Sequence, residues 1–324
     1  MSKNIKVFNF IDGMCNAGIY RDGEFGTAIK VYELFLEAAS NYPNMRFNLV
    51  FNDLDKTRVR VFKEVCKMLS SEHTLTKPLS NIKLHYSNND INAFICDLPK
   101  HDNLLSKYGT LTLLFIDPYN ARTVDVPILH DYIESHYCEL FFNWFSSDHV
   151  RNPGDSTINS CFSGLAIPPG GDAAQFVAKY LAGEKKSFFS YSFRNQKNAE
   201  IYQIIFITPN LKGLEKIKEA LWQTFGGEEY HRNHQSASYQ ASIFSLDAGK
   251  DIRKELYGEE ARQVLIDELV PGRYTYDQIA AFVLQRSMLR TSDIIQHVIK
   301  PLIAKGVIKK LNIAGARNFK KRQL

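Results

Sequence analysis

The sequence lacks the paired cysteines and the long apolar runs that mark several classes of protein. Its five cysteines are odd in number and widely spaced, and no two form a Cys-x-x-Cys pair, which argues against a disulfide framework and against a zinc site. No window reaches about 18 uninterrupted apolar residues, and the first residues carry no apolar signal segment. We therefore expect a cytoplasmic protein with no membrane partner.

The sequence also lacks a histidine metal motif and a large net charge. The nine histidines include no His-Glu-x-x-His motif, so no metal site is expected. A net charge of +5 permits a nucleic-acid partner but falls short of the footprint of a dedicated binder. With 44% hydrophobic and 23% charged residues, the composition is that of an ordinary globular protein.

Short apolar runs alternate with helical patterns through the first half of the chain. The expected strands are 5–11, 46–52, 82–86, 111–116 and 138–145, and the intervening helices are 26–40, 55–70, 90–97 and 126–133. This alternation predicts a parallel sheet with right-handed crossovers. We predict an α/β, Rossmann-like domain over 1–226, interrupted by an irregular insertion at about 146–172 that is rich in Ser, Asn, Pro and Gly.

The C-terminal part has a different pattern. A polar linker is expected over 227–255, followed by a winged-helix-like domain over 256–324 that consists of helices and a basic hairpin. The hairpin carries the candidate nucleic-acid-binding residues Lys309, Lys310, Arg317, Lys320 and Lys321. Such a cluster contacts phosphates in nucleic-acid binders, but a solvated face or a protein-binding surface has the same composition.

Acidic residues stand where the predicted strands end. In an open parallel sheet, ligands bind outside the carboxyl ends of the strands, so Asp12, Asp53 and Asp117 are expected to share one crevice. Asp53 is in position to accept hydrogen bonds from ribose hydroxyls, with Asp55 as a competitor. Asp90, after the third strand, either meets an adenine amine or caps the next helix.

The connection from Asp12 to Gly18 is a candidate cofactor loop. Asp12, Gly13, Asn16 and Gly18 are its expected cofactor-binding residues, because small residues let the backbone approach a ligand. The spacing is not Gly-x-Gly-x-x-Gly, and Asn16 occupies a position where glycine is expected. Asparagine tolerates left-handed backbone better than most residues. An ordinary strand-to-helix turn is the alternative.

Asp117, Pro118 and Tyr119 form the candidate catalytic turn. Amino methyltransferases carry an Asp/Asn-Pro-Pro-Tyr tetrad at this place, in which the acid or amide and a proline carbonyl accept hydrogen bonds from the target nitrogen and the aromatic ring stacks on the substrate. Here tyrosine follows the first proline directly. An Asp-Pro turn after a strand is also common in α/β proteins generally.

Taken together, these segments resemble the three-Cys-motif partner (TcmP) family. Residues 11–18 resemble that family's first-strand loop, Gly26-Thr27-Ala28 its Gly-Ser-Pro, and residues 115–119 its Phe-Ile-Asp-Pro-aromatic signature. Phe193-Arg194-Asn195 followed by Ile201-Tyr202 resembles its late strand pair. Departures are Cys15 and Asn16 in the loop and Asn120 after the aromatic.

The resemblance implies a class I methyltransferase-like fold, S-adenosylmethionine (SAM) as cofactor, and a three-Cys-motif protein as partner. The expected function is a SAM-dependent methyltransferase, with an amine of a nucleic acid as the acceptor. A catalytically degenerate, methyltransferase-like adaptor that binds nucleic acid or a partner through the winged helix is the alternative. A metal-dependent nuclease using Asp53, Asp90 and Asp117 is weaker, because no His or Glu stands at ligand spacing nearby.

Overall fold

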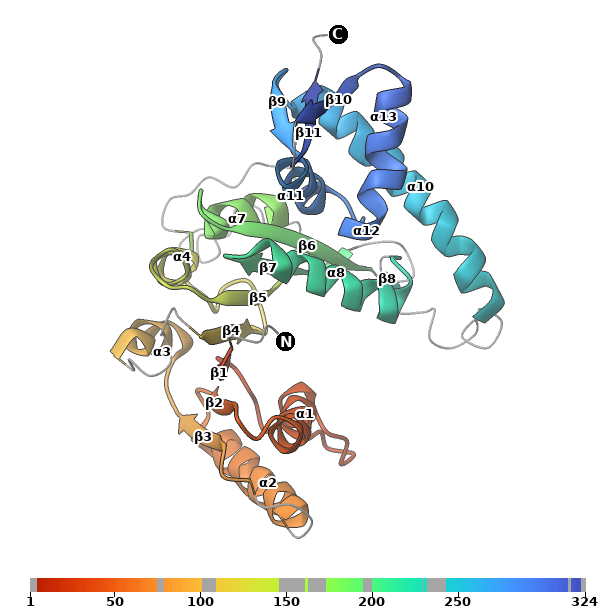
Figure 1. Cartoon of the computed structure of the whole chain (residues 1–324). Helices are drawn as coiled ribbons and strands as arrows, with labels where there is room; N and C mark the ends of the chain where they lie inside the picture. Colours follow the sequence, from red (N-terminus) through yellow and green to blue (C-terminus); the bar gives the residue numbers. More distant parts are fainter. Residues whose placement is uncertain are drawn as a thin grey trace. The chain divides into compact units, whose positions relative to one another are not determined.

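The computed structural model of the chain describes residues 5–74, 79–100, 109–145, 161–162, 173–194, 200–228, 230–231, 243–313 and 316–321. Contacts divide the chain into two units (Figure 1). The first holds Met1–Lys185 and Tyr202–Pro209, and the second holds Lys186–Ile201 and Asn210–Leu324. No helix among the described residues combines the length and the apolar character that crossing a membrane requires.

The first unit is built on a Rossmann-like sheet. Its elements are β1 (Val7–Asp12), α1 (Thr27–Asn41), β2 (Arg46–Asn52), α2 (Lys56–Thr74), β3 (Ile82–Ser87), α3 (Ile91–Asp97), the 3-10 turn η1 (Leu98–Lys100), β4 (Thr110–Ile116), α4 (Val126–Ser135), β5 (Glu139–Trp144), α7 (Ala173–Ala182) and most of β7 (Glu200–Thr208). The strand order is β3-β2-β1-β4-β5-β7; the first five strands are parallel and β7 is antiparallel to β5. This order confirms the Rossmann-like α/β sheet predicted for the first part of the chain.

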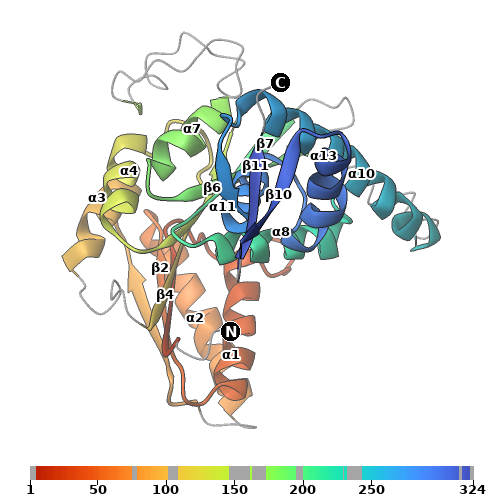
Figure 2. The same ribbon diagram turned by 45° about the horizontal axis from the view of Figure 1, so that its top comes forward.

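Helices lie on both faces of this sheet, with α1 and α2 on one and α3 and α4 on the other (Figures 1 and 2). On the α1 face, alternate strand residues form an aromatic and aliphatic core that includes Phe10, Phe47, Leu49 and Phe51, all at most 4% exposed. Helix α1 buries Ile29, Tyr32 and Leu36 at helical spacing against this core.

The α3 face is polar at mid-strand. Asn9 of β1 is fully buried; its amide donates to Thr112 of β4 (3.2 Å) and accepts from Asn48 of β2 (2.8 Å). Buried amides of this kind must be hydrogen-bonded, and here they bond across three strands. The parallel strands therefore carry polar residues at mid-strand on this side, unlike the continuous apolar runs that are usual in a sheet packed under helices on both faces.

The second unit combines β6 (Ser187–Arg194), α8 (Leu211–Phe225) and β8 (Tyr230–His231) with the C-terminal helices and strands. The C-terminal elements are α10 (Ile243–Glu268), β9 (Arg273–Thr275), α11 (Tyr276–Arg286), α12 (Thr291–Ile294), the π-helical turn η3 (Ile295–Ile299), α13 (Lys300–Ala304), β10 (Ile308–Ile313) and β11 (Ala316–Lys321). Strands β9, β10 and β11 form an antiparallel sheet in the order β10-β11-β9.

The boundaries differ from those expected from the sequence. Helix α8, which the sequence assigns to the first domain, groups by contacts with the C-terminal elements, and α10 begins inside the predicted linker over 227–255. The reason is packing: the α8 side chain of Trp222 donates to the carbonyl of Met288 (2.7 Å), and its ring faces Tyr257 of α10. Of the insertion predicted at 146–172, only 161–162 are among the described residues.

Lys218 of α8 is fully buried inside the second unit. Its ammonium donates to the backbone carbonyls of Leu284 and Ser287 and lies 4.3 Å from the centroid of the Phe189 ring. Burial without a carboxylate partner lowers the pKa of Lys218 well below its usual value. Removing the side chain is costly because it leaves a cavity and two buried carbonyls without a donor.

We expect Lys218→Ala to cost about 2–4 kcal/mol of unfolding free energy through the cavity and the two carbonyls left without a donor. Lys218→Met fills the cavity but leaves the same two carbonyls without a donor, so it should cost less than Lys218→Ala by the cavity contribution alone. Because the folded-state pKa is depressed, wild-type stability should rise between pH 7 and 10, and the Met variant should not share that rise. Urea unfolding followed by tryptophan fluorescence measures the unfolding free energy of wild type and of the two variants. Equal losses in the two variants would contradict this account.

Candidate functional site

The carboxyl ends of β1 and β4 meet where the strand order reverses. β1 pairs with β2 on one side and with β4 on the other, so the chain leaves β1 and β4 toward opposite faces of the sheet. Asp12 ends β1 opposite Phe115, two residues before Asp117. A cavity of about 370 Å³ opens at this point, with Asp12, Asn16, Asp117, Tyr119 and Asn143 among the residues that line it.

A second cavity of about 270 Å³ adjoins the carboxyl ends of β2 and β3. Asp53, Arg58 and Asp90 line it, and Met14 and Tyr119 line both cavities. The structure therefore brings the predicted residues of the first loop, the second and third strand ends and the Asp-Pro-Tyr turn to one edge of one sheet.

The loop after β1 contains a left-handed residue at the position where the sequence has Asn16 in place of the expected glycine. Asn16 has a φ of 59°, in the left-handed region, and its side-chain oxygen accepts from the amide of Ala17 (2.8 Å). Among non-glycine residues asparagine adopts this conformation at the lowest cost, so the missing glycine does not distort the turn. The amide of Asn16 in turn donates to the Asp53 carboxylate (3.0 Å).

The two loop glycines lie where an added side chain would meet close neighbours. A Cβ on Gly13 would lie 2.6 Å from side-chain carbons of Ile116 and Ile91. Gly18 has a φ of +70°, and a Cβ there would lie 2.6 Å from Ile29 and Phe62. Glycine is thus needed at 18, where the backbone is left-handed and the loop approaches α1 and α2 closely, whereas a side chain at 13 would displace the ends of the two isoleucines.

Asp53 anchors the loop. One of its carboxylate oxygens accepts from the Asn16 amide and the other from the amide of Asp55 (2.8 Å), and the side chain is 4% exposed. Asp55 caps α2 by accepting from the amide of Thr57 (2.7 Å). Asp90 caps α3, accepting from the amides of Asn92 and Ala93, so the helix-cap alternative foreseen for it is present.

Asp12 is the most perturbed acid of the site. It is 2% exposed and accepts one hydrogen bond, from the amide of Met14 (3.0 Å). The pKa of the Asp12 carboxyl is raised to about 7, chiefly by burial; the Met14 bond opposes the rise, and the charges of Asp117 and Asp53 add to it. A buried acid that titrates near neutrality beside a cavity is a functional-site candidate, because a bound cation would stabilise its charged form.

Asp117 and Tyr119 are each held by a residue that the sequence analysis did not single out. Asn143 of β5 donates to Asp117 (2.7 Å), and Arg58 of α2 donates to the hydroxyl of Tyr119 (2.5 Å) with its guanidinium 5.5 Å from the ring centroid. Desolvation raises the pKa of both Asp117 and Tyr119. Pro118 between them is buried.

Asn143 had one detectable signal in the sequence. It is the amide inside the otherwise apolar run from Leu140 to Phe145, and the pairing of Ile116 with Phe142 places it beside Asp117 at the sheet edge. Arg58 had none, because its position near Tyr119 depends on how α2 packs on the sheet.

The basic C-terminal residues lie in the hairpin of the second unit. Lys309 and Lys310 are exposed on β10, and the register places Lys309 opposite Lys320 and Ile308 opposite Lys321. Arg317 pairs with Asn312. The side chains of Arg317, Lys320 and Lys321 are outside the described part of the structure. No group of three or more His, Cys, Asp or Glu side chains suited to a metal ion occurs among the described residues.

No protein-family profile and no curated protein sequence matches the chain. Among solved structures, it is similar to a Listeria monocytogenes protein assigned to the class I SAM-dependent methyltransferases (10% identity, TM-score 0.34, 64% of this chain and 56% of that one). It is also similar to a SAM-dependent methyltransferase of Methanosarcina mazei, with 10% identity and a TM-score of 0.31. That match covers 63% of this chain and 92% of the other. A third similar structure is the plantazolicin methyltransferase BamL, in complex with a triazolic desmethylPZN analogue and S-adenosylhomocysteine (SAH). The identity is 8%, the TM-score is 0.33, and the match covers 63% of this chain and 77% of the other.

The chain thus spans little more than half the length of the first of these proteins. The Rossmann-like assignment of the first unit rests on its own strand order and crossovers.

The buried Asp12 predicts a pH-dependent stability. Because burial raises its folded-state pKa from 3.8 to about 7, its contribution to stability falls as pH rises from about 4 to about 7 and is constant above that. Asn at this position accepts the same Met14 bond without a charge, so between pH 5 and 8 wild type should lose about 2–3 kcal/mol relative to Asp12→Asn.

Urea unfolding at the two pH values measures this difference. Asp22→Asn is the matched control, since Asp22 makes the equivalent bond to the amide of Glu24 on the exposed surface. The explanation fails if the stability of wild type and of Asp12→Asn depends on pH in the same way.

Proposed function

We propose that the first unit binds SAM at the carboxyl edge of its sheet and transfers the methyl group to an amine, with a nucleic acid as the acceptor class. The observation that carries the proposal is the buried Asp12 carboxyl, with its pKa near 7, on the wall of a cavity that it shares with Asp117 and Tyr119. A cationic ligand is what such a carboxyl would select.

The two cavities fit the two halves of this cofactor. The cavity beside Asp53 and Asp90 lies where a Rossmann-like sheet holds a nucleoside, and its neighbour beside Asp12 would take the cationic amino-acid part. Met14 and Tyr119, which line both, would lie along the middle of the ligand. Asp53 retains lone pairs for a ribose hydroxyl in addition to its two backbone bonds.

When bound, SAM supplies an electrophilic methyl group on a sulfonium. Asp117 and the carbonyl of Pro118 would accept hydrogen bonds from the acceptor amine and so aim its lone pair, while the ring of Tyr119 stacks on a flat substrate. The hydrogen bond from Asn143 orients Asp117, and Arg58 orients the Tyr119 ring. The raised pKa of Asp117 suits it to take up the proton that the amine loses.

The resemblance to the TcmP family supports a three-Cys-motif protein as partner, so we propose a two-component system. The C-terminal elements run helix, helix and antiparallel hairpin, the order of a winged helix, and the adjacent Lys309 and Lys320 positions would bring positive charge to a nucleic-acid backbone.

Calorimetric titration with SAM and with SAH tests the cofactor site. Both should bind to wild type and to Asp22→Asn, and Asp12→Asn should weaken binding at least tenfold by removing the charge that faces the ligand. Because the ionised form of Asp12 is the binding form, wild-type affinity should rise about tenfold between pH 6 and 8, and the Asn variant should not share this rise. No heat above dilution in wild type would refute cofactor binding.

The acceptor site is tested by transfer of a labelled methyl group from SAM to DNA and RNA, with the three-Cys-motif partner present. Asp117→Ala should reduce transfer by about 100-fold or more through loss of orientation and proton uptake, while its SAH affinity stays within a few-fold of wild type. Equal transfer by wild type and Asp117→Ala would remove Asp117 from the acceptor site.

The second candidate function is an adaptor without catalysis, and the loop favours it at one point: Asn16 stands where the cofactor loop of the resembled family has glycine. An Asp12→Ala variant that binds neither SAM nor SAH but keeps full biological activity would establish the adaptor and exclude the methyltransferase.

A further inference from the structure

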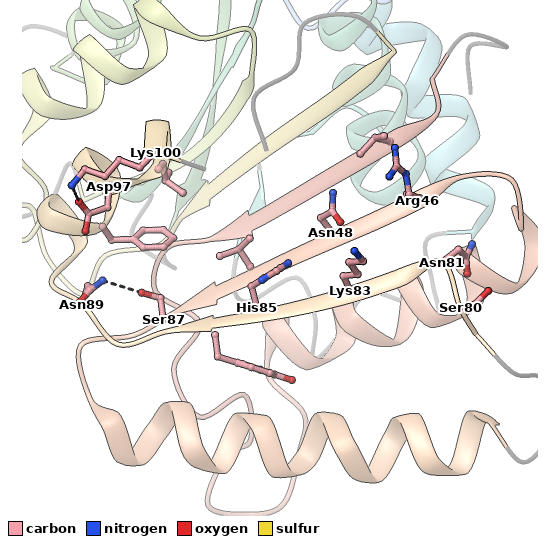
Figure 3. A pocket seen from close by; sticks show the side chains of 15 residues that line it. Arg46, Asn48, Ser80, Asn81, Lys83, His85, Ser87, Asn89, Asp97 and Lys100 are labelled. Carbon is pink, nitrogen blue, oxygen red and sulfur yellow. Dashed lines mark hydrogen bonds and ion pairs between the residues drawn. The ribbon is translucent and has the colours of Figure 1, made fainter. Parts of the chain in front are cut away.

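A third concave surface of the first unit lies on the α3 face of the sheet (Figure 3) and shares one lining residue, Asn89, with the cavity beside Asp53. This groove has a volume of about 690 Å³ and extends along β2 from Arg46 to Val50 and along β3 and its flanking residues from Asn81 to Asn89. Arg46 and Asn48 from β2 and Lys83 and His85 from β3 reach into it from the same side of the sheet. Its size is within the range of small-molecule sites.

The groove exists because α3 is short. Helix α3 has seven residues, and its buried side chains Ile91, Phe94 and Ile95 cover only the carboxyl-terminal part of the strands. Below it the strands alternate, so that one face is apolar and the other carries Arg46, Asn48, Lys83 and His85. A face meant to be packed under a helix would not carry three basic side chains at adjacent positions.

The groove carries a surplus of positive charge. Among the residues that the structure describes, neither Arg46 nor Lys83 has an ion-pair partner, and both are exposed. Asp97 is the one acid among the described lining residues, and Lys100 neutralises it at 2.6 Å. The charges of Arg46 and Lys83 are therefore not balanced within the groove.

The amides of the groove hold its shape. Asn81 donates to the carbonyls of Ala39, Tyr42 and Met45, which ties β3 to the turn before β2. Asn48 belongs to the buried ladder through Asn9 to Thr112 and stands opposite Lys83 in the register. The cationic side chains thus extend from a rigid, hydrogen-bonded floor, which reduces the entropy lost on binding a ligand.

We propose that this groove binds the phosphate of a nucleotide-sized ligand, independently of the SAM site. Arg46 provides a planar fork of donors suited to two phosphate oxygens, and Lys83 on the neighbouring strand provides a point charge. The volume leaves room for a nucleoside beside the phosphate.

The test is titration of the full chain with uridine diphosphate and with pyrophosphate, in the presence of saturating SAH so that the strand-end site does not contribute. Wild type should bind both, and Arg46→Gln/Lys83→Gln should weaken binding at least tenfold, because each charged hydrogen bond contributes about that factor. Tighter binding of uridine diphosphate identifies a nucleotide, and equal binding identifies phosphate alone. An octauridylate that binds far more tightly than either identifies a strand.

Lys30→Gln/Arg60→Gln is the matched control. It removes the same two charges from exposed positions on α1 and α2, on the other face of the sheet. All four side chains are exposed, so both variants should keep the wild-type circular dichroism and melting temperature. Absence of binding to wild type, or an equal loss in the control variant, would overturn the proposal, whereas failure of SAH to bind would bear only on the methyltransferase.

Discussion

The parallel pairing of β1 with β2 on one side and β4 on the other is the constraint on which the rest of the first unit depends. It puts the chain exits from β1 and β4 on opposite faces and leaves a crevice between them. The loop after β1 must then pass close over β4 at Gly13 and close against α1 and α2, which Gly18 allows. The Asp53 carboxylate holds this loop through the amide of Asn16.

That geometry places the carboxyls of Asp12 and Asp117 in one cavity but in different surroundings. Asp12 is buried at the crevice with one hydrogen bond, so burial disfavours its charged form and a bound cation would stabilise that form, while Asp117 is exposed to solvent and accepts a hydrogen bond from Asn143. Two carboxyls in one cavity thus meet different surroundings: one suited to hold a cationic ligand and one suited to exchange a proton. This division is the physical basis of the proposed methyl transfer.

The two faces of the same sheet have different energetics. The α1 face excludes water with packed aromatic rings such as Phe51 and Phe62, whose centroids are 4.5 Å apart. The α3 face holds a hydrogen-bonded amide ladder and unbalanced cations, which the period-two alternation of residues 46–50 and 82–86 already contained. The pattern did not reveal that this face is partly uncovered, because periodicity reports which residues share a face and not what covers it.

The sequence by itself determined the strands, their order of appearance, the acids at their ends and the left-handed tolerance of Asn16, because these follow from local periodicity and turn chemistry. Only the tertiary structure decided that Asp53 binds the backbone amide of Asn16, that Asn143 and Arg58 join the site, and that α8 groups with the C-terminal elements through Lys218 and Trp222. Those facts depend on contacts between residues far apart in the chain, and the free energy of such contacts is set by packing and desolvation, which no local pattern encodes.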